Sequence, residues 1–272
     1  MNFGNGPIGV FDSGVGGLTV VAELRRRMPG QDILYFGDTA RVPYGNKSPE
    51  TVRRYSMEIG RFLVAQGISY LVVACNTSSA VALEALDAAM PVPVLGMIEP
   101  GARAAAVATS NGKVGMVGTR ATVASGAYAK AIERVRPDVR VFSQPCPLFV
   151  PLVEEGWTDG PVVVQVAHRY LDALLREGVD TLILGCTHYP VLIPVIRQVA
   201  GPGVTLLSSA TTAADALQGL LPESAGSGEG SIGKLKCYVT DAGTHFAEIA
   251  ERILGEPVGE LVAIEEERLV VP

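Results

Sequence analysis

Two apolar segments of the sequence each end in a cysteine that polar residues follow. The first, TLILGCTHYP (residues 181–190), is a β-type run that stops at a glycine and leads into Cys186 and His188. The second, YLVVACNTSSA (residues 70–80), ends in Cys75. Open α/β sheets bind their ligands beyond the carboxyl ends of the strands. We therefore expect both thiols to lie where such a sheet would carry a binding site.

A thiol can act as a nucleophile, a metal ligand or an acid/base, and each role requires different neighbours. A nucleophilic cysteine needs one base, which would leave the second cysteine unexplained. A zinc site needs three or four ligands, for example Cys75, Cys186, His188 and a carboxylate, but no ligand-spacing motif supports it. Racemisation removes an α-proton from one face of an amino acid and returns a proton to the other face. Two thiols with pKa values shifted toward the working pH can serve that reaction in both directions.

Cofactor chemistry finds less support in the sequence. A pyridoxal phosphate enzyme needs a lysine for the Schiff base, and no lysine follows the carboxyl end of an apolar strand. The apolar run 7–11 leads into Asp12, Ser13 and a glycine turn, but this turn lacks the Walker lysine and the dinucleotide spacing. A small carboxylate at the following helix N-terminus would fit the same amides. We expect neither a cofactor nor a metal.

The elements that would position these residues alternate between strand and helix along the whole chain. We expect strands at 7–11, 33–37, 70–74, 91–100, 113–119, 139–146, 181–184, 204–209, 234–240 and 260–264. Helices are expected at 18–28, 49–66, 77–90, 101–109, 121–135, 161–177, from Pro190 onward, at 210–221 and at 243–254. Residues 146–157 form a proline-interrupted segment, and 222–233 an exposed loop. Alternation of this kind predicts an α/β fold of mostly parallel sheets flanked by helices.

The two cysteine segments occur in similar settings about one small domain apart, so we predict two similar lobes that face one another. The chain of 272 residues has ample material for two cores. Its formal net charge of −6 argues against a nucleic-acid-binding surface. It contains no apolar run of 18 residues and no signal-peptide pattern, and its four cysteines form no CxxC motif. We therefore expect a cytoplasmic protein with no membrane association.

Several longer strings resemble the cofactor-independent glutamate racemases of the aspartate/glutamate racemase superfamily. These strings are GVFDSGVGGLTV, YFGDTARVPYG, VACNTSSA, GMVGTRATVASGAY, CPLFVPLVEEG, LILGCTHYP and YVTDAGTHFAEIAERILG. The resemblance runs nearly from end to end. It implies two α/β lobes with the active site in the cleft between them. One lobe would contain residues 1–98 and 208–272, and the other residues 99–207.

The resemblance also implies which residues act on the substrate. Cys75 matches the residue that exchanges the α-proton of D-glutamate, and Cys186 the residue that acts on L-glutamate. Asp12 is similar to the carboxylate that assists the first thiol, and His188 and Glu154 to the assistants of the second. Substrate contacts carry over to Asp12, Ser13, Tyr44, Gly45, Asn76, Thr77, Thr119, Thr122, Thr187 and His188. This set contains hydroxyl, amide and backbone donors but no arginine.

Two positions are left open by the sequence. Glu155 follows Glu154 directly, so either glutamate could face the site. Asp38 could be a second carboxylate near the site or a turn former.

The expected activity is interconversion of L- and D-glutamate for peptidoglycan synthesis. The alternatives are a racemase of aspartate or another acidic amino acid, a cysteine-nucleophile hydrolase, and an amino-acid-binding protein without turnover. The expected partner is the small-molecule substrate, and the family resemblance suggests a homodimer.

Overall fold

The structure is a computed structural model that describes residues 6–221 and 232–269. Most of the expected loop at 222–233 lies outside these residues. The strands are β1 (Ile8–Asp12), β2 (Ile33–Gly37), β3 (Tyr70–Val73), β4 (Val94–Gly96), β5 (Lys113–Gly118), β6 (Arg140–Pro145), β7 (Thr181–Gly185), β8 (Thr205–Ser208), β9 (Leu235–Val239) and β10 (Glu260–Ala263). The α-helices are α1 (Leu18–Arg27), α2 (Pro49–Ala65), α3 (Asn76–Val81), α4 (Leu83–Ala89), α5 (Ile98–Ala108), α6 (Arg120–Ser125), α7 (Ala127–Val135), α8 (Phe149–Glu154), α9 (Gly160–Arg176), α10 (Ile193–Ala200), α11 (Ser209–Leu220) and α12 (Thr244–Leu254). Short 3-10 turns are η1 (Thr39–Arg41), η2 (Tyr44–Asn46), η3 (Tyr189–Leu192) and η4 (Glu266–Arg268).

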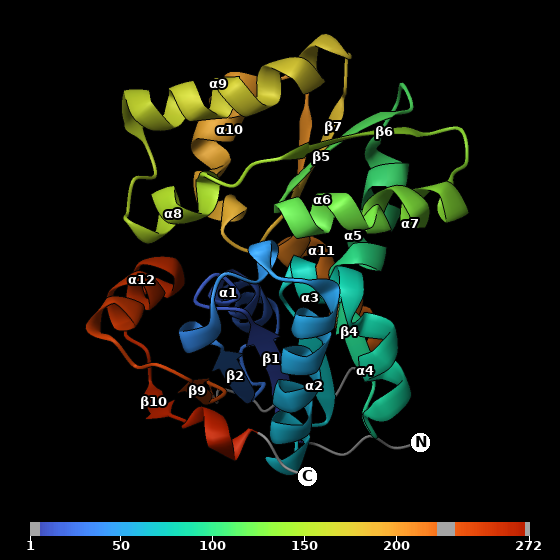
Figure 1. Cartoon of the computed structure of the whole chain (residues 1–272). Coiled ribbons are helices and arrows are strands. Elements are labelled where there is room, and N and C mark those ends of the chain that lie inside the picture. The colour runs from blue at the N-terminus through green and yellow to red at the C-terminus, as the bar shows by residue number, and fades with distance from the viewer. Residues whose placement is uncertain (1–5, 222–231, 270–272) are drawn as a thin grey trace.

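The described strands form two parallel sheets, one in each lobe (Figure 1). The larger sheet has the order β10-β9-β2-β1-β3-β4, and the smaller one the order β6-β5-β7-β8. The smaller sheet therefore repeats the order β2-β1-β3-β4 of the larger one, which puts β3 and β7 in equivalent places. In the larger sheet, β1 is flanked by β2 on one side and by β3 on the other. In the smaller sheet, β5 is flanked in the same way by β6 and β7. This arrangement creates a binding crevice at the carboxyl ends of the strands, and the predicted α/β fold with two similar lobes is confirmed.

Helices cover both faces of each sheet because successive side chains of a strand point to opposite faces. In the larger sheet, Ile8 and Val10 of β1 pack with α1 and α11, whereas Phe11 packs with α2. In the smaller sheet, Met116 of β5 packs with α5 and α7, whereas Val117 packs with α8 and α9. Burial of each apolar side chain of this size stabilises the folded state by about 1.5–3 kcal/mol relative to its exposure to water. The carboxyl ends of β3 and β7, which the cysteines follow, therefore belong to separate hydrophobic cores.

Some expected elements differ from the structure. Residues 91–100 were expected to form one strand, but β4 has three residues and α5 already begins at Ile98. Pro91 and Pro93 have no N–H for a ladder, whereas Pro100 falls in the first turn of α5, where no N–H is needed. The expected helix 121–135 is interrupted at Gly126, whose φ is 65°.

Two further segments differ in detail from what the sequence led us to expect. The expected helix 77–90 is interrupted at Ala82 and forms α3 and α4. The proline-interrupted segment 146–157 contains the helix α8, and Pro151 lies in its first turn. The last strands, β9 and β10, extend the larger sheet beyond β2. The lobe boundaries near residues 98 and 208 remain a prediction.

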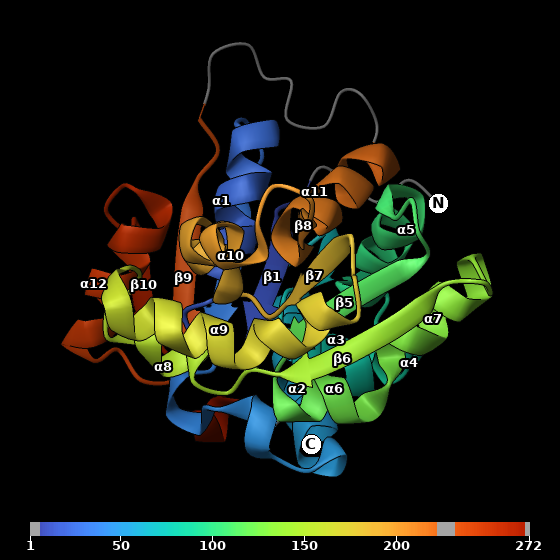
Figure 2. The same ribbon diagram turned by 90° about the horizontal axis from the view of Figure 1, so that it is seen from above.

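The lobes contact each other on two sides of the cleft. On one side the Tyr128 hydroxyl of α7 donates a 2.7 Å hydrogen bond to Asn76 Oδ1 of α3. Both side chains are buried, and the Asn76 amide donates in turn to Ser209 Oγ of α11. On the other side α8 lies beside α12 (Figures 1 and 2), and a Cβ at Gly156 would lie 2.5 Å from Nη1 of Arg252. These contacts fix how the carboxyl ends of the two sheets face one another.

Replacing Tyr128 with phenylalanine is expected to lower the free energy of unfolding by about 1–3 kcal/mol, because Asn76 Oδ1 would stay buried without its donor. Urea denaturation followed by circular dichroism measures this difference. Tyr55→Phe is the matched control, since no hydrogen bond of the Tyr55 hydroxyl is found among the described residues. Equal stability of the two variants would contradict a role of this bond between the lobes.

Candidate active site

Both strand-end thiols face the same cavity. Cys75 follows β3 and is the N-cap of α3, and Cys186 follows β7. Each is only 5% exposed, and both line a cavity of about 310 Å³ between the lobes. The other predicted residues that line it are Ser13, Tyr44, Gly45, Asn76, Thr77, Thr119, Glu154, Thr187 and His188. Asp12 and Thr122 are buried behind its wall.

The surroundings of Cys75 favour its neutral form. Burial raises the pKa of the thiol to about 11, and the nearby charge of Asp12 acts in the same direction. Hydrogen bonds from the Ser78 N–H and from the hydroxyls of Ser78 and Ser13 oppose this shift, because they stabilise the thiolate. Cys75 is therefore a thiol at neutral pH, with donors in place for the thiolate.

Asp12 lies at the end of β1 and links the two lobes. Its carboxylate accepts hydrogen bonds from the Gly14 N–H (3.1 Å) and from the Thr187 hydroxyl (3.3 Å). Burial raises the pKa of Asp12, whereas the charge of His188 and these hydrogen bonds lower it. The Thr19 hydroxyl donates to the carbonyl of Thr187 across the same boundary (2.9 Å).

Cys186, His188 and Glu154 form a chain of contacts in the smaller lobe. Cys186 Sγ lies 3.9 Å from His188 Nδ1, and His188 Nε2 lies 3.1 Å from Glu154 Oε1. Burial lowers the His188 pKa, but the hydrogen bonds and charges of Cys186 and Glu154 outweigh it and raise the pKa to about 10. His188 is thus an imidazolium at neutral pH, and its positive charge stabilises negative charge on Cys186.

Which glutamate faces the site is also visible. Glu154 lines the cavity and contacts His188, whereas Glu155 is exposed and lies outside the cavity. Gly16 allows His188 to approach α1, because a Cβ there would lie 2.4 Å from His188 Nδ1. Only glycine permits this approach without displacement of the imidazole.

Three threonines meet where the lobes join. The Thr77 hydroxyl lies 2.9 Å from that of Thr119 and 3.2 Å from that of Thr122, and the latter two are 3.0 Å apart. Gly45 packs against Thr119, because a Cβ at Gly45 would lie 2.7 Å from Thr119 Cβ. Such a set of hydroxyl donors can bind a carboxylate.

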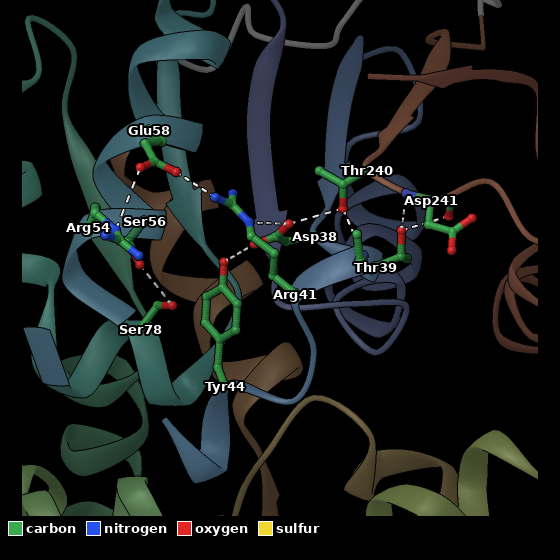
Figure 3. Close-up of polar contacts among 11 residues, drawn as sticks. Asp38, Thr39, Arg41, Tyr44, Arg54, Ser56, Glu58, Ser78, Thr240 and Asp241 are labelled. Atoms are coloured by element: carbon green, nitrogen blue, oxygen red, sulfur yellow. Dashed lines mark hydrogen bonds and ion pairs between the residues drawn. The ribbon is translucent and has the colours of Figure 1, made fainter. Parts of the chain in front are cut away.

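Tyr44, which lines the cavity, is positioned by a polar network that includes Asp38 and Arg41 (Figure 3). Its hydroxyl donates to Asp38, which also accepts hydrogen bonds from Arg41 Nε (2.8 Å) and the Thr240 hydroxyl (3.0 Å). Arg41 Nη1 pairs with Glu58 in α2. Burial lowers the Arg41 pKa, but Asp38 and Glu58 raise it overall, so the guanidinium stays charged. Asp38 is therefore neither a lining carboxylate nor only a turn former, since it orients a tyrosine that lines the cavity.

Ser78 and Arg120 were missed by the sequence reasoning. Ser78 accepts a 3.0 Å hydrogen bond from Ser56 of α2 (Figure 3) and donates toward Cys75. Arg120 lines the cavity although no arginine was expected there. Its place in the sequence could have indicated this, because Arg120 directly follows Thr119 beyond the end of β5.

The described residues contain neither a membrane-spanning helix nor a metal-binding cluster. No helix among them is long and apolar enough to cross a membrane. Within residues 6–221 and 232–269, no group of three or more histidine, cysteine, aspartate or glutamate side chains is arranged to hold a metal ion.

Comparison with known proteins gives a consistent picture. The Asp/Glu/hydantoin racemase family model matches residues 18–217. A glutamate racemase from Geobacter metallireducens is 52% identical over 270 residues, covering 96% of this chain and 98% of that protein.

Solved structures agree with the sequence comparison. Glutamate racemase from Francisella tularensis in complex with D-glutamate superposes with a TM-score of 0.89 at 37% identity and covers 96% of this chain and 98% of that one. Glutamate racemase from Thermus thermophilus in complex with β-chloro-D-alanine gives 0.87 at 46% identity, with coverage of 97% and 98%. With the model match and these relatives together, the chain belongs to the Asp/Glu/hydantoin racemase family of isomerases.

Proposed function

We propose that this protein is a glutamate racemase that exchanges the α-proton through two cysteine bases. The observation that carries the proposal is that Cys75 and Cys186 follow equivalent strands of two similar lobes and line one cavity. A reaction that must treat two mirror-image substrates alike needs one base from each side. The glutamate racemases that match this chain over nearly their whole length support glutamate as the substrate.

In the L-to-D direction, the Cys186 thiolate removes the α-proton and the Cys75 thiol supplies a proton to the opposite face. The His188 imidazolium beside Cys186 and the raised pKa of Cys75 favour this starting arrangement. In the reverse direction the Cys75 thiolate is the base, and the donors of Ser13 and Ser78 stabilise its charge. Asp12 assists the first thiol, and His188 with Glu154 assists the second.

Substrate binding is assigned to the groups around the cavity. The hydroxyls of Thr77, Thr119 and Thr187 and the amide of Asn76 are the donors available for two carboxylates. The resemblance to glutamate racemases further supports a role in peptidoglycan synthesis, a cytoplasmic location and a homodimeric assembly.

Incubation with pure L-glutamate or L-aspartate in heavy water is expected to give D-glutamate with deuterium at the α-carbon, and much slower turnover of aspartate. Cys75→Ala and Cys186→Ala should each reduce racemisation at least hundredfold, because general acid–base groups contribute about 10²–10⁴-fold. Chiral chromatography and NMR measure the products. Cys146→Ala is the control, since this buried cysteine does not line the cavity. No α-exchange in the parent protein, or near-normal turnover by either variant, would refute the two-base proposal.

Glu154→Gln is expected to lower kcat roughly tenfold or more, because a hydrogen bond to a charged group contributes about 1.5–3 kcal/mol. Its neighbour offers a matched control, since Glu155→Gln removes the same charge from an exposed side chain. Steady-state kinetics of both variants make the comparison. An equal loss in both variants would show that the contact with His188 is irrelevant to turnover.

The activity should also fall at high pH. The His188 pKa of about 10 keeps the imidazolium charged below that value, and its loss above pH 10 removes the positive charge beside Cys186. We expect kcat/KM to decline with an apparent pKa near 10. His188→Asn should be slower at every pH and should lack this limb. An unchanged limb in His188→Asn would assign the titration to another group.

A further inference from the structure

A second cavity adjoins the active-site cavity. It has a volume of about 460 Å³ and is lined by residues of η2, α2, α3 and α6. The two cavities share Gly45, Asn46, Thr77 and Arg120 in their linings. The two cavities therefore adjoin along a shared wall.

The second cavity is positively charged although the chain has a net charge of −6. Lys47 and Arg120 line it, and its lining contains no acidic residue. Arg120 is exposed and Lys47 half-buried. Within the described part of the chain, neither side chain forms a hydrogen bond or an ion pair, and Lys47 Nζ lies 6.0 Å from the ring centre of Tyr55. Neither charge is thus neutralised by an acidic partner.

The inner cavity, by contrast, contains acidic groups as well as basic ones. Glu154 lines it and Asp12 is buried behind it, and the proposed mechanism requires a thiolate there, whereas its basic side chains are His188 and Arg120. A dicarboxylate that approaches these groups is repelled unless positive charge lies along its path. A cleft with charge of one sign concentrates ligands of the other sign and raises their rate of association.

We infer that the second cavity is the entrance for the substrate, and that Arg120 and Lys47 attract acidic amino acids into it. This inference rests on the proposed racemase function. Arg120 lines both cavities, so it can follow the carboxylate from the entrance to the threonine hydroxyls. Its proposed contribution is positive charge along the path of the substrate.

The test compares the racemisation kinetics of Arg120→Gln, Lys47→Gln and the double variant with those of the parent protein. Each single change is expected to lower kcat/KM for glutamate about three- to tenfold at low salt. Lys47→Gln, which changes a residue outside the active-site cavity, should keep kcat at saturation within twofold. The loss should shrink as salt increases, because the Debye length falls from about 10 Å at 0.1 M to about 3 Å at 1 M. Arg120→Lys should retain most of the activity, since it keeps the charge.

Arg103→Gln and Lys130→Gln are matched controls, because they remove the same charges from exposed positions outside both cavities. If the parent protein racemises glutamate but the entrance variants and the control variants have equal kcat/KM, the proposed entrance is refuted. The proposed racemase function would be unaffected by that result. An Arg120→Lys variant as impaired as Arg120→Gln would also overturn it, in favour of a specific guanidinium contact. A parent protein without racemisation would instead refute the proposed function itself.

Discussion

The His188 side chain carries a positive charge at a place that water hardly reaches, and the site is arranged around this constraint. Its residue is only 5% exposed. An isolated buried charge costs several kcal/mol and would be lost by deprotonation. Contacts with Cys186 and Glu154 reverse this tendency and raise the pKa to about 10. The imidazolium therefore depends on the negative groups around it, and in turn it stabilises negative charge on Cys186.

The same constraint connects the two lobes. The charge of His188 acts on Asp12, which belongs to β1 of the other lobe and is bound by Thr187. Gly16 lies so close to the imidazole that a larger residue would displace it. Elsewhere small hydroxyl groups, such as those of Thr77 and Thr119, form the boundary. The contacts that join the lobes are largely the contacts that shape the cavity, so a change in lobe orientation would alter both at once.

The sequence predicted the α/β class and the repeated lobes because strand–helix alternation and apolar runs are local patterns. It also predicted the cysteines at the ends of β3 and β7, since their polar companions follow them directly in the chain. It failed at helix ends such as Gly126 and Ala82, where a single residue decides between one helix and two.

Other features depend on contacts between residues far apart in sequence. Tyr44 lies in a recognisable turn, but the support that Asp38 receives from Thr240 joins segments about two hundred residues apart. The sequence alone does not show which of the serines after Cys75 supports the thiol. Ser78 is identified by its hydrogen bond with Ser56, which α2 brings close to it. Which of Glu154 and Glu155 faces the site likewise depends on α8, a helix that was not predicted because the segment contains prolines. Such facts come from packing, which the order of residues does not display.

The two thiols are chemically alike but differ in what stabilises their charge. Cys186 lies beside a cation, whereas Cys75 lies beside a carboxylate and receives neutral donors from Ser13 and Ser78. A cation beside each thiol would favour two thiolates and leave no proton donor for the second face. A carboxylate beside each would favour two thiols and leave no base. For the proposed two-base mechanism, these unequal surroundings suit Cys186 as the base and Cys75 as the acid, and the donors around Cys75 suit the exchange of these roles in the reverse direction.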